Sequence, residues 1–100
     1  MSYQVRFAPR AANDIQRLFD FLADEDLPAA ERARMAIGQA IEVLKSFPFA
    51  CRKALPDNPF LREMVIEFGH AGYVALYEIE DTKTVTILAV RHQREEDFFQ

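Results

Sequence analysis

The sequence predicts an α+β domain with an N-terminal strand, an antiparallel two-helix hairpin, and three antiparallel strands forming one sheet with the helices on one face. Apolar residues alternate near the N-terminus, recur at helical spacing through residues 10–47, and alternate again in three segments between residues 61 and 92. A helical block followed by strands is typical of this fold class. The chain has 100 residues, near the commonest domain size, so we expect one domain over residues 1–100.

The first half of the chain is predicted to contain a short strand and two amphipathic helices. Apolar side chains at positions 3, 5 and 7 alternate with polar ones, which predicts a strand with one buried face. Pro9 suits the first turn of a helix, where its missing N–H costs nothing, and residues 10–24 then carry an apolar stripe. A second stripe spans residues 28–47 after a short break, so we expect an antiparallel helical hairpin.

The second half is predicted to be a loop followed by strands. Pro, Asp and Asn between positions 48 and 59 favour a loop. Strands are expected at residues 61–68, 73–79 and 85–92, and in the last we place Val85, Ile87 and Ala89 opposite Leu88 and Val90. The last two strands are apolar on both faces, whereas one helical hairpin covers only one. Either the second face is covered within the monomer or a partner completes it.

Composition argues against several classes of function. The chain has 16 acidic and 12 basic residues and a net charge of −4, so no direct contact with nucleic acid is expected. Cys51 has no cysteine partner, and with His70 and His92 it does not match the spacing of a metal site; we expect no disulfide, metal or cofactor. No apolar run approaches the ~20 residues that span a bilayer, so we expect a cytoplasmic protein without membrane contact.

Three segments together form a family pattern. They are Tyr3-Gln4-Val5-Arg6-Phe7-Ala8-Pro9-Arg10-Ala11 with Asp14-Ile15, then Phe47-Pro48 with Arg52, and then Gly72-Tyr73-Val74-Ala75-Leu76-Tyr77 with Val85-Thr86-Ile87-Leu88-Ala89-Val90-Arg91-His92-Gln93-Arg94-Glu95. In this order and spacing they resemble the RelE/ParE toxin family, in its ParE-like branch, along essentially the whole chain. The resemblance implies the toxin of a type II toxin–antitoxin system, bound and silenced by a cognate antitoxin in a hetero-oligomer.

The family has two kinds of target, and the residues favour one. ParE-like members act on DNA gyrase without nuclease chemistry, whereas RelE-like members cut messenger RNA on the ribosome. A nuclease would use His92, Arg91, Arg62 and Arg52 as acid, base and cations. However, Gln93 stands where several nucleases of the family carry Tyr, and acidic residues follow. We therefore interpret the chain as a non-enzymatic gyrase inhibitor; the alternatives are a RelE-type endoribonuclease and a non-toxic binding module.

Two sets of residues are candidates for binding. For the target we choose Arg and aromatic residues at the C-terminal end, because these types are enriched in interface hot spots; the set is Arg91, His92, Arg94, Phe98 and Phe99. By resemblance, the antitoxin covers an apolar groove beside the helical hairpin and the sheet. Its expected contacts are Leu18, Phe21, Leu22, Val74 and Leu76.

Overall fold

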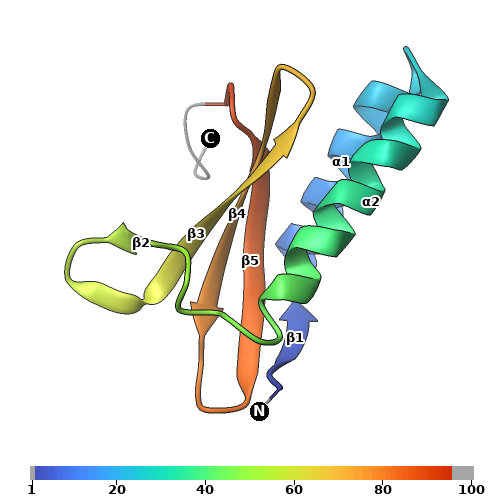
Figure 1. Ribbon diagram of the computed structural model, residues 1–100. Helices are drawn as coiled ribbons and strands as arrows, with labels where there is room; N and C mark the ends of the chain where they lie inside the picture. The colour runs from blue at the N-terminus through green and yellow to red at the C-terminus, as the bar shows by residue number, and fades with distance from the viewer. Residues whose placement is uncertain (1, 96–100) are drawn as a thin grey trace.

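The computed structural model describes residues 2–95, which form two helices and a five-stranded sheet. The elements in chain order are β1 (Gln4–Phe7), α1 (Pro9–Ala23), α2 (Leu27–Val43), β2 (Arg52–Leu55), β3 (Asn58–Phe68), β4 (Ala71–Ile79) and β5 (Thr84–His92). The sheet order is β1-β5-β4-β3-β2, and the two helices lie side by side on one face of the sheet (Figure 1). The α+β fold class is thus confirmed. Within residues 2–95, no helix has the length and apolar character needed to cross a membrane.

The helices begin where the sequence provides starting signals. Pro9 lies in the first turn of α1, as expected. Asp26 caps α2, because its carboxylate accepts a hydrogen bond from the backbone N–H of Ala29 at 3.0 Å. The predicted end of this helix at residue 47 was wrong, since α2 ends at Val43 and continues as tight turns with bonds such as Leu44 N–H to the Ile41 carbonyl.

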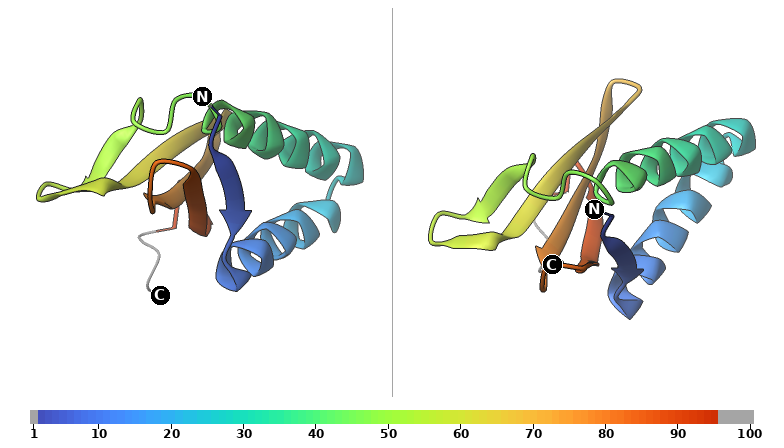
Figure 2. Two further views of the ribbon diagram at one scale, coloured as in Figure 1. Left: turned by 90° about the horizontal axis from the view of Figure 1, so that it is seen from below. Right: turned by 60° about the horizontal axis from the view of Figure 1, so that its bottom comes forward.

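The predicted loop before residue 59 was also wrong, because it contains strand β2 and the start of β3. Arg52 pairs with Glu63 and Lys53 with Arg62 in an antiparallel ladder. Three of the four β2 side chains are exposed, so the strand has no apolar alternation from which it could be predicted. This hairpin extends away from the helices at the edge of the sheet (Figure 2).

The sheet is mixed, and β5 has a bulge. β1 runs parallel to β5, whereas the other neighbouring strands are antiparallel. Leu76 pairs with Ala89 and Tyr77 with Ile87, so Leu88 is an extra residue in β5. The bulge reverses the inward and outward alternation after Ile87. The predicted phase of this strand was therefore wrong beyond that point, because Val90, not Ala89, joins Ile87 in the core beneath the helices.

β4 is buried on both faces within this chain. On the helix side, its residues Tyr73, Ala75 and Tyr77 belong to the main core. On the other side, Val74 (3% exposed) and Leu76 (8%) form a second cluster with Ala89. Partly buried residues of β2, β3 and β5 pack around that second cluster. The structure therefore favours the first of the two explanations for the apolar second face.

Candidate functional site

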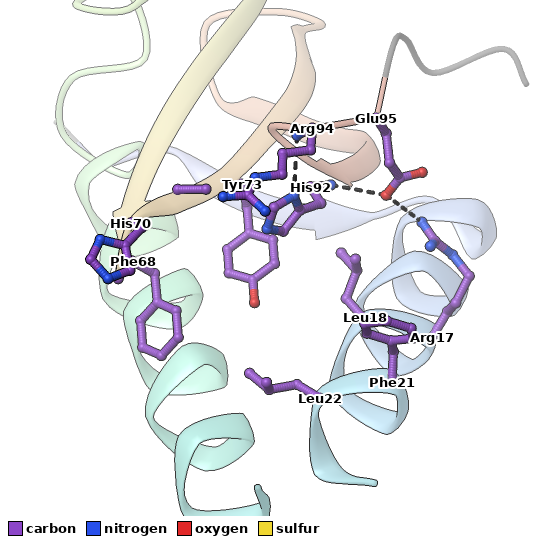
Figure 3. A pocket seen from close by; sticks show the side chains of 12 residues that line it. Arg17, Leu18, Phe21, Leu22, Phe68, His70, Tyr73, His92, Arg94 and Glu95 are labelled. Carbon is purple, nitrogen blue, oxygen red and sulfur yellow. Dashed lines mark hydrogen bonds and ion pairs between the residues drawn. The ribbon is translucent and has the colours of Figure 1, made fainter. Parts of the chain in front are cut away.

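A cleft of about 710 Å³ lies between α1, the turn joining β3 to β4, and the end of β5 (Figure 3). Its α1 wall is apolar because Leu18 and Leu22 are one helical turn apart and face the sheet. Phe21 lies at the cleft and is 73% exposed, more than any other large apolar side chain in residues 2–95. Phe68, at the end of β3, lines the cleft and packs against the main core.

Tyr73 and His92 are neighbours on the sheet side of the cleft. They pair across β4 and β5, and their rings meet edge to face with centroids 5.6 Å apart. Tyr73 is 5% exposed, and burial raises the pKa of its hydroxyl. That hydroxyl points into the cleft and has no hydrogen-bond partner among residues 2–95 (Figure 3). The His92 Nδ1 accepts the backbone N–H of Arg94 at 3.1 Å, which leaves Nε2 to carry the ring proton.

A carboxylate closes the edge of the cleft next to His92. Glu95 accepts the backbone N–H of His92 at 3.0 Å and the Arg17 guanidinium at 3.2 Å. Burial disfavours the charged form of Glu95, but these two donors outweigh it, so its pKa lies below the usual range. Glu95 is therefore ionised, and its carboxylate holds the residues after β5 against α1.

The two predicted target-binding residues of β5 are consecutive and so lie on opposite faces of the sheet, and the bulge decides which face each one takes. His92 pairs with Tyr73 on the helix side, whereas Arg91 pairs with Val74 on the other side. There the Arg91 guanidinium donates to the backbone carbonyl of Glu95 at 2.8 Å and, at longer distances, to those of His92 and Gln93. Arg91 thus supports the turn that follows β5.

The predicted nuclease residues do not come together. Arg62 donates to the carbonyls of Pro59 and Cys51 beneath the connection between α2 and β2. Its strand partner is Tyr77, four positions along β4 from the cleft, roughly 13 Å at the usual rise per residue. Arg52 lies on the edge strand β2 and bonds Glu63 at 3.2 Å. Within residues 2–95, no group of His, Cys, Asp and Glu side chains is arranged to hold a metal ion.

The predicted antitoxin contacts divide between two surfaces. Leu18, Phe21 and Leu22 line the cleft, whereas Val74 and Leu76 lie on the opposite face of the sheet, where they are buried.

Of the remaining predicted target contacts, Arg94 lines the cleft. The predicted target contacts Phe98 and Phe99 lie outside the described residues.

Sequence reasoning did not identify Arg17, Tyr73 and Glu95 as parts of one site. Arg17 has no distinguishing neighbours in the sequence, and Glu95 was grouped with the acidic residues that follow it. Arg17 and Glu95 meet across 78 positions of the chain. The available signals were the family-like segments from Gly72 to Tyr77, which contains Tyr73, and from Val85 to Glu95, but neither segment shows which side of the sheet these residues occupy.

Comparisons with known proteins agree on one family. The model of the ParE toxin of type II toxin–antitoxin systems, parDE, matches residues 5–97. Toxin RelE1 of Caulobacter vibrioides is 32% identical over 79 residues, which cover 79% of this chain and 82% of that protein.

Two solved structures are similar to this one. A chromosomal ParDE system from P. aeruginosa has a TM-score of 0.73 at 17% identity, covering 91% of this chain and 96% of the other; at this identity it shows the fold alone. The toxin–antitoxin complex RelBE2 from Mycobacterium tuberculosis has a TM-score of 0.59 at 27% identity, covering 93% and 100%.

Proposed function

We propose a function for this chain from its family, because the chain belongs to the ParE toxins of type II toxin–antitoxin systems. It is the toxin component, bound and neutralised by a cognate antitoxin in a hetero-oligomer. When released, it acts in the cytoplasm by binding and inhibiting DNA gyrase, without chemistry of its own.

The open apolar cleft with Phe21 at its side carries the proposal of an antitoxin site. Phe21 is 73% exposed beside the partly buried Leu22, and burying these two side chains under the apolar surface of a partner is favourable. An amphipathic helix or extended segment fits such a groove, because its apolar side chains replace water against the α1 wall. Val74 and Leu76 have no place in this site, since the chain already buries them on the other face.

The positions of the basic residues support a non-enzymatic action. RNA cleavage without a metal needs an acid, a base and cations around one phosphate. Arg52 and Arg62 lie away from His92, and Arg91 faces the opposite side of the sheet. We propose that Arg91, His92 and Arg94, with Phe98 and Phe99, contact gyrase through the end of β5 and the residues after it.

One observation favours the alternative, a RelE-type messenger RNA endoribonuclease. Tyr73, His92 and Arg94 all line the cleft, and together they provide a phenol, an imidazole and a cation. Under this alternative, His92 is indispensable. Under the gyrase proposal, replacing its imidazole changes a contact but removes no reaction step.

The decisive experiment uses three assays on one set of proteins. Wild type, His92→Ala and a chain ending at residue 95 are each tested for growth arrest without antitoxin, for inhibition of gyrase supercoiling, and for messenger RNA cleavage in a translating extract. We expect wild type and His92→Ala to inhibit supercoiling and leave messenger RNA intact, and the truncated chain to lose inhibition. Codon-phased cleavage that His92→Ala abolishes, with unaffected gyrase, would refute the gyrase proposal. Absence of growth arrest and of both activities would indicate the non-toxic binding module.

A further inference from the structure

The edge of the cleft contains a binding position for a carboxylate, and Glu95 fills it. Two donors from different elements meet there: the backbone N–H of His92 at 3.0 Å and the guanidinium of Arg17 at 3.2 Å (Figure 3). Arg17 is 53% exposed in its side chain and also lies 4.0 Å from Asp14. A charge-assisted contact at such an exposed position exchanges readily for an equivalent carboxylate from another molecule.

The charges around the cleft favour an anionic ligand. Of the side chains in residues 2–95 that line it, Arg17 and Arg94 are cationic and Glu95 is the one acid. Within residues 2–95 no carboxylate forms an ion pair with Arg94, in contrast to Arg17. This concentration of positive charge is local, because the whole chain carries a net charge of −4. An acidic ligand is therefore repelled by the chain as a whole and attracted at this position.

The floor of the cleft requires apolar groups together with one hydrogen-bond acceptor. Leu18, Leu22 and Phe68 supply apolar surface. Tyr73 as a whole is 5% exposed, and its hydroxyl points into the cleft without a hydrogen-bond partner among residues 2–95. Burial raises the pKa of this hydroxyl, so it remains a donor at neutral pH. The hydroxyl is accessible to water in the empty cleft, so a ligand that covers it must offer an acceptor in place of that water.

We propose that the cleft binds an acidic amphipathic segment of a protein partner, and that a carboxylate of this segment replaces Glu95 at Arg17. The apolar side chains of the segment pack on the wall formed by Leu18, Phe21 and Leu22. An oxygen atom of the segment accepts a hydrogen bond from the Tyr73 hydroxyl. Glu95 is thus an internal competitor that satisfies the two donors while the cleft is empty and lowers the affinity for weak ligands. The inference deepens the proposed antitoxin site and rests on it for the partner's identity, but not for the chemistry of the cleft.

A peptide selection tests this chemistry without an identified partner. The full-length chain is immobilised, and a phage library of random 16-residue peptides is selected against it, with Phe21→Ser as a counter-selection. We expect enriched peptides to combine Asp or Glu with apolar residues three or four positions apart. Enrichment of basic or wholly uncharged peptides would contradict the proposal.

Titration of one enriched peptide, made synthetically with a fluorophore, then separates the residues. Arg17→Gln should weaken binding about tenfold and flatten its dependence on salt, because a charge-assisted contact is lost. Arg10→Gln is the matched control, since Arg10 is also an exposed arginine on α1 that pairs with Asp14, at 3.6 Å, but does not line the cleft. It should stay within about twofold of wild type.

Glu95→Gln provides the sharpest test, because the proposal predicts that this variant binds the peptide more tightly than wild type. Removing the internal competitor should strengthen binding several-fold, while thermal unfolding confirms that the fold is kept. The proposal that a partner carboxylate replaces Glu95 would be overturned if Glu95→Gln bound the peptide more weakly than wild type, or if Arg17→Gln and Arg10→Gln changed its affinity equally. The titration does not depend on toxicity: peptide binding without growth arrest would refute the toxin function alone, and growth arrest without these peptide effects would refute the exchange alone.

Discussion

Asp14 holds α1 to β5 at the point where β5 loses a strand partner. The pairing of β1 with β5 ends at Phe7 and Ile87. Beyond that point α1 replaces β1 beside β5, and the Asp14 carboxylate accepts the backbone N–H of Val90 at 2.9 Å. Val90 is 1% exposed, so no water replaces this acceptor easily. Changing Asp14 to Ala therefore leaves a buried N–H without a partner.

The expected loss of stability follows from that single contact. A hydrogen bond to a charged group contributes about 1.5–3 kcal/mol, and its loss leaves the donor unsatisfied. The ion pairs of Asp14 with Arg10 (3.6 Å) and Arg17 (4.0 Å) involve exposed arginines and contribute little. Alanine has a higher helix propensity than Asp, and this difference raises the free energy of unfolding by up to about 0.7 kcal/mol. We expect a net loss of about 2 kcal/mol, which lowers Tm by roughly 8–16 °C for a chain of this size.

Denaturant unfolding followed by circular dichroism measures this loss. Asp14→Asn keeps an acceptor oxygen and should lose about half as much, because its hydrogen bond is no longer charge-assisted. Asp20→Ala is the matched control in the same helix, since Asp20 only accepts a bond from the exposed Gln16, and it should stay within about 0.5 kcal/mol of wild type. An Asp14→Ala variant as stable as the Asp20→Ala control would refute the reasoning.

Three further predictions concern stability. Tyr77→Phe should cost about 1–2 kcal/mol in denaturant unfolding, because the Tyr77 hydroxyl donates to the buried carbonyl of Pro48 at 2.7 Å; no change would show that the bond contributes nothing. Gly72→Ala should cost about 3 kcal/mol, since its Cβ would lie 2.0 Å from the Ile66 carbonyl oxygen and force the β3–β4 pair apart; an unchanged Tm would contradict this. Burial raises the pKa of the Tyr73 hydroxyl above its unfolded value near 10, so its contribution to stability is complete below about pH 10 and is lost as pH rises through the folded pKa. Unfolding free energies at pH 8 and 11 should therefore differ less for Tyr73→Phe than for wild type, and equal differences would refute the assignment.

The helical half of the fold could be predicted from the sequence because its signals are local. The apolar stripe of α1 placed Leu18 and Leu22 on one face, and Pro9 marked its start. β2 could not be predicted in this way, since its side chains are mostly exposed and it is defined by pairing with β3. An alternating apolar pattern arises only where one face of a strand is buried, and a short edge strand buries few of its side chains.

Which side chains of β5 face the helices could not be predicted either, because this strand is apolar on both faces. From Ile87 to Val90 every residue is apolar, so both faces of the strand look alike in the sequence and an inserted residue leaves no trace. The bulge is visible only in the pairing with β4. The same limit applies to the cleft, because Arg17 and Glu95 are adjacent only after α1 has packed beside β5.

The contacts of α1 explain why this phase matters for the cleft. Asp14 binds the backbone of β5 just after the bulge, and one turn later Arg17 binds Glu95 just after the end of the strand. Both contacts come from neighbouring positions on α1, so the helix fixes β5 and the residues after it together. With the bulge, the strand delivers His92 to this side and sends Arg91 to the other, where it supports the turn that presents Glu95. Without the extra residue, the alternation would place Arg91 in the cleft, and neither the donor at His92 nor the carboxylate at Arg17 would occupy its present position.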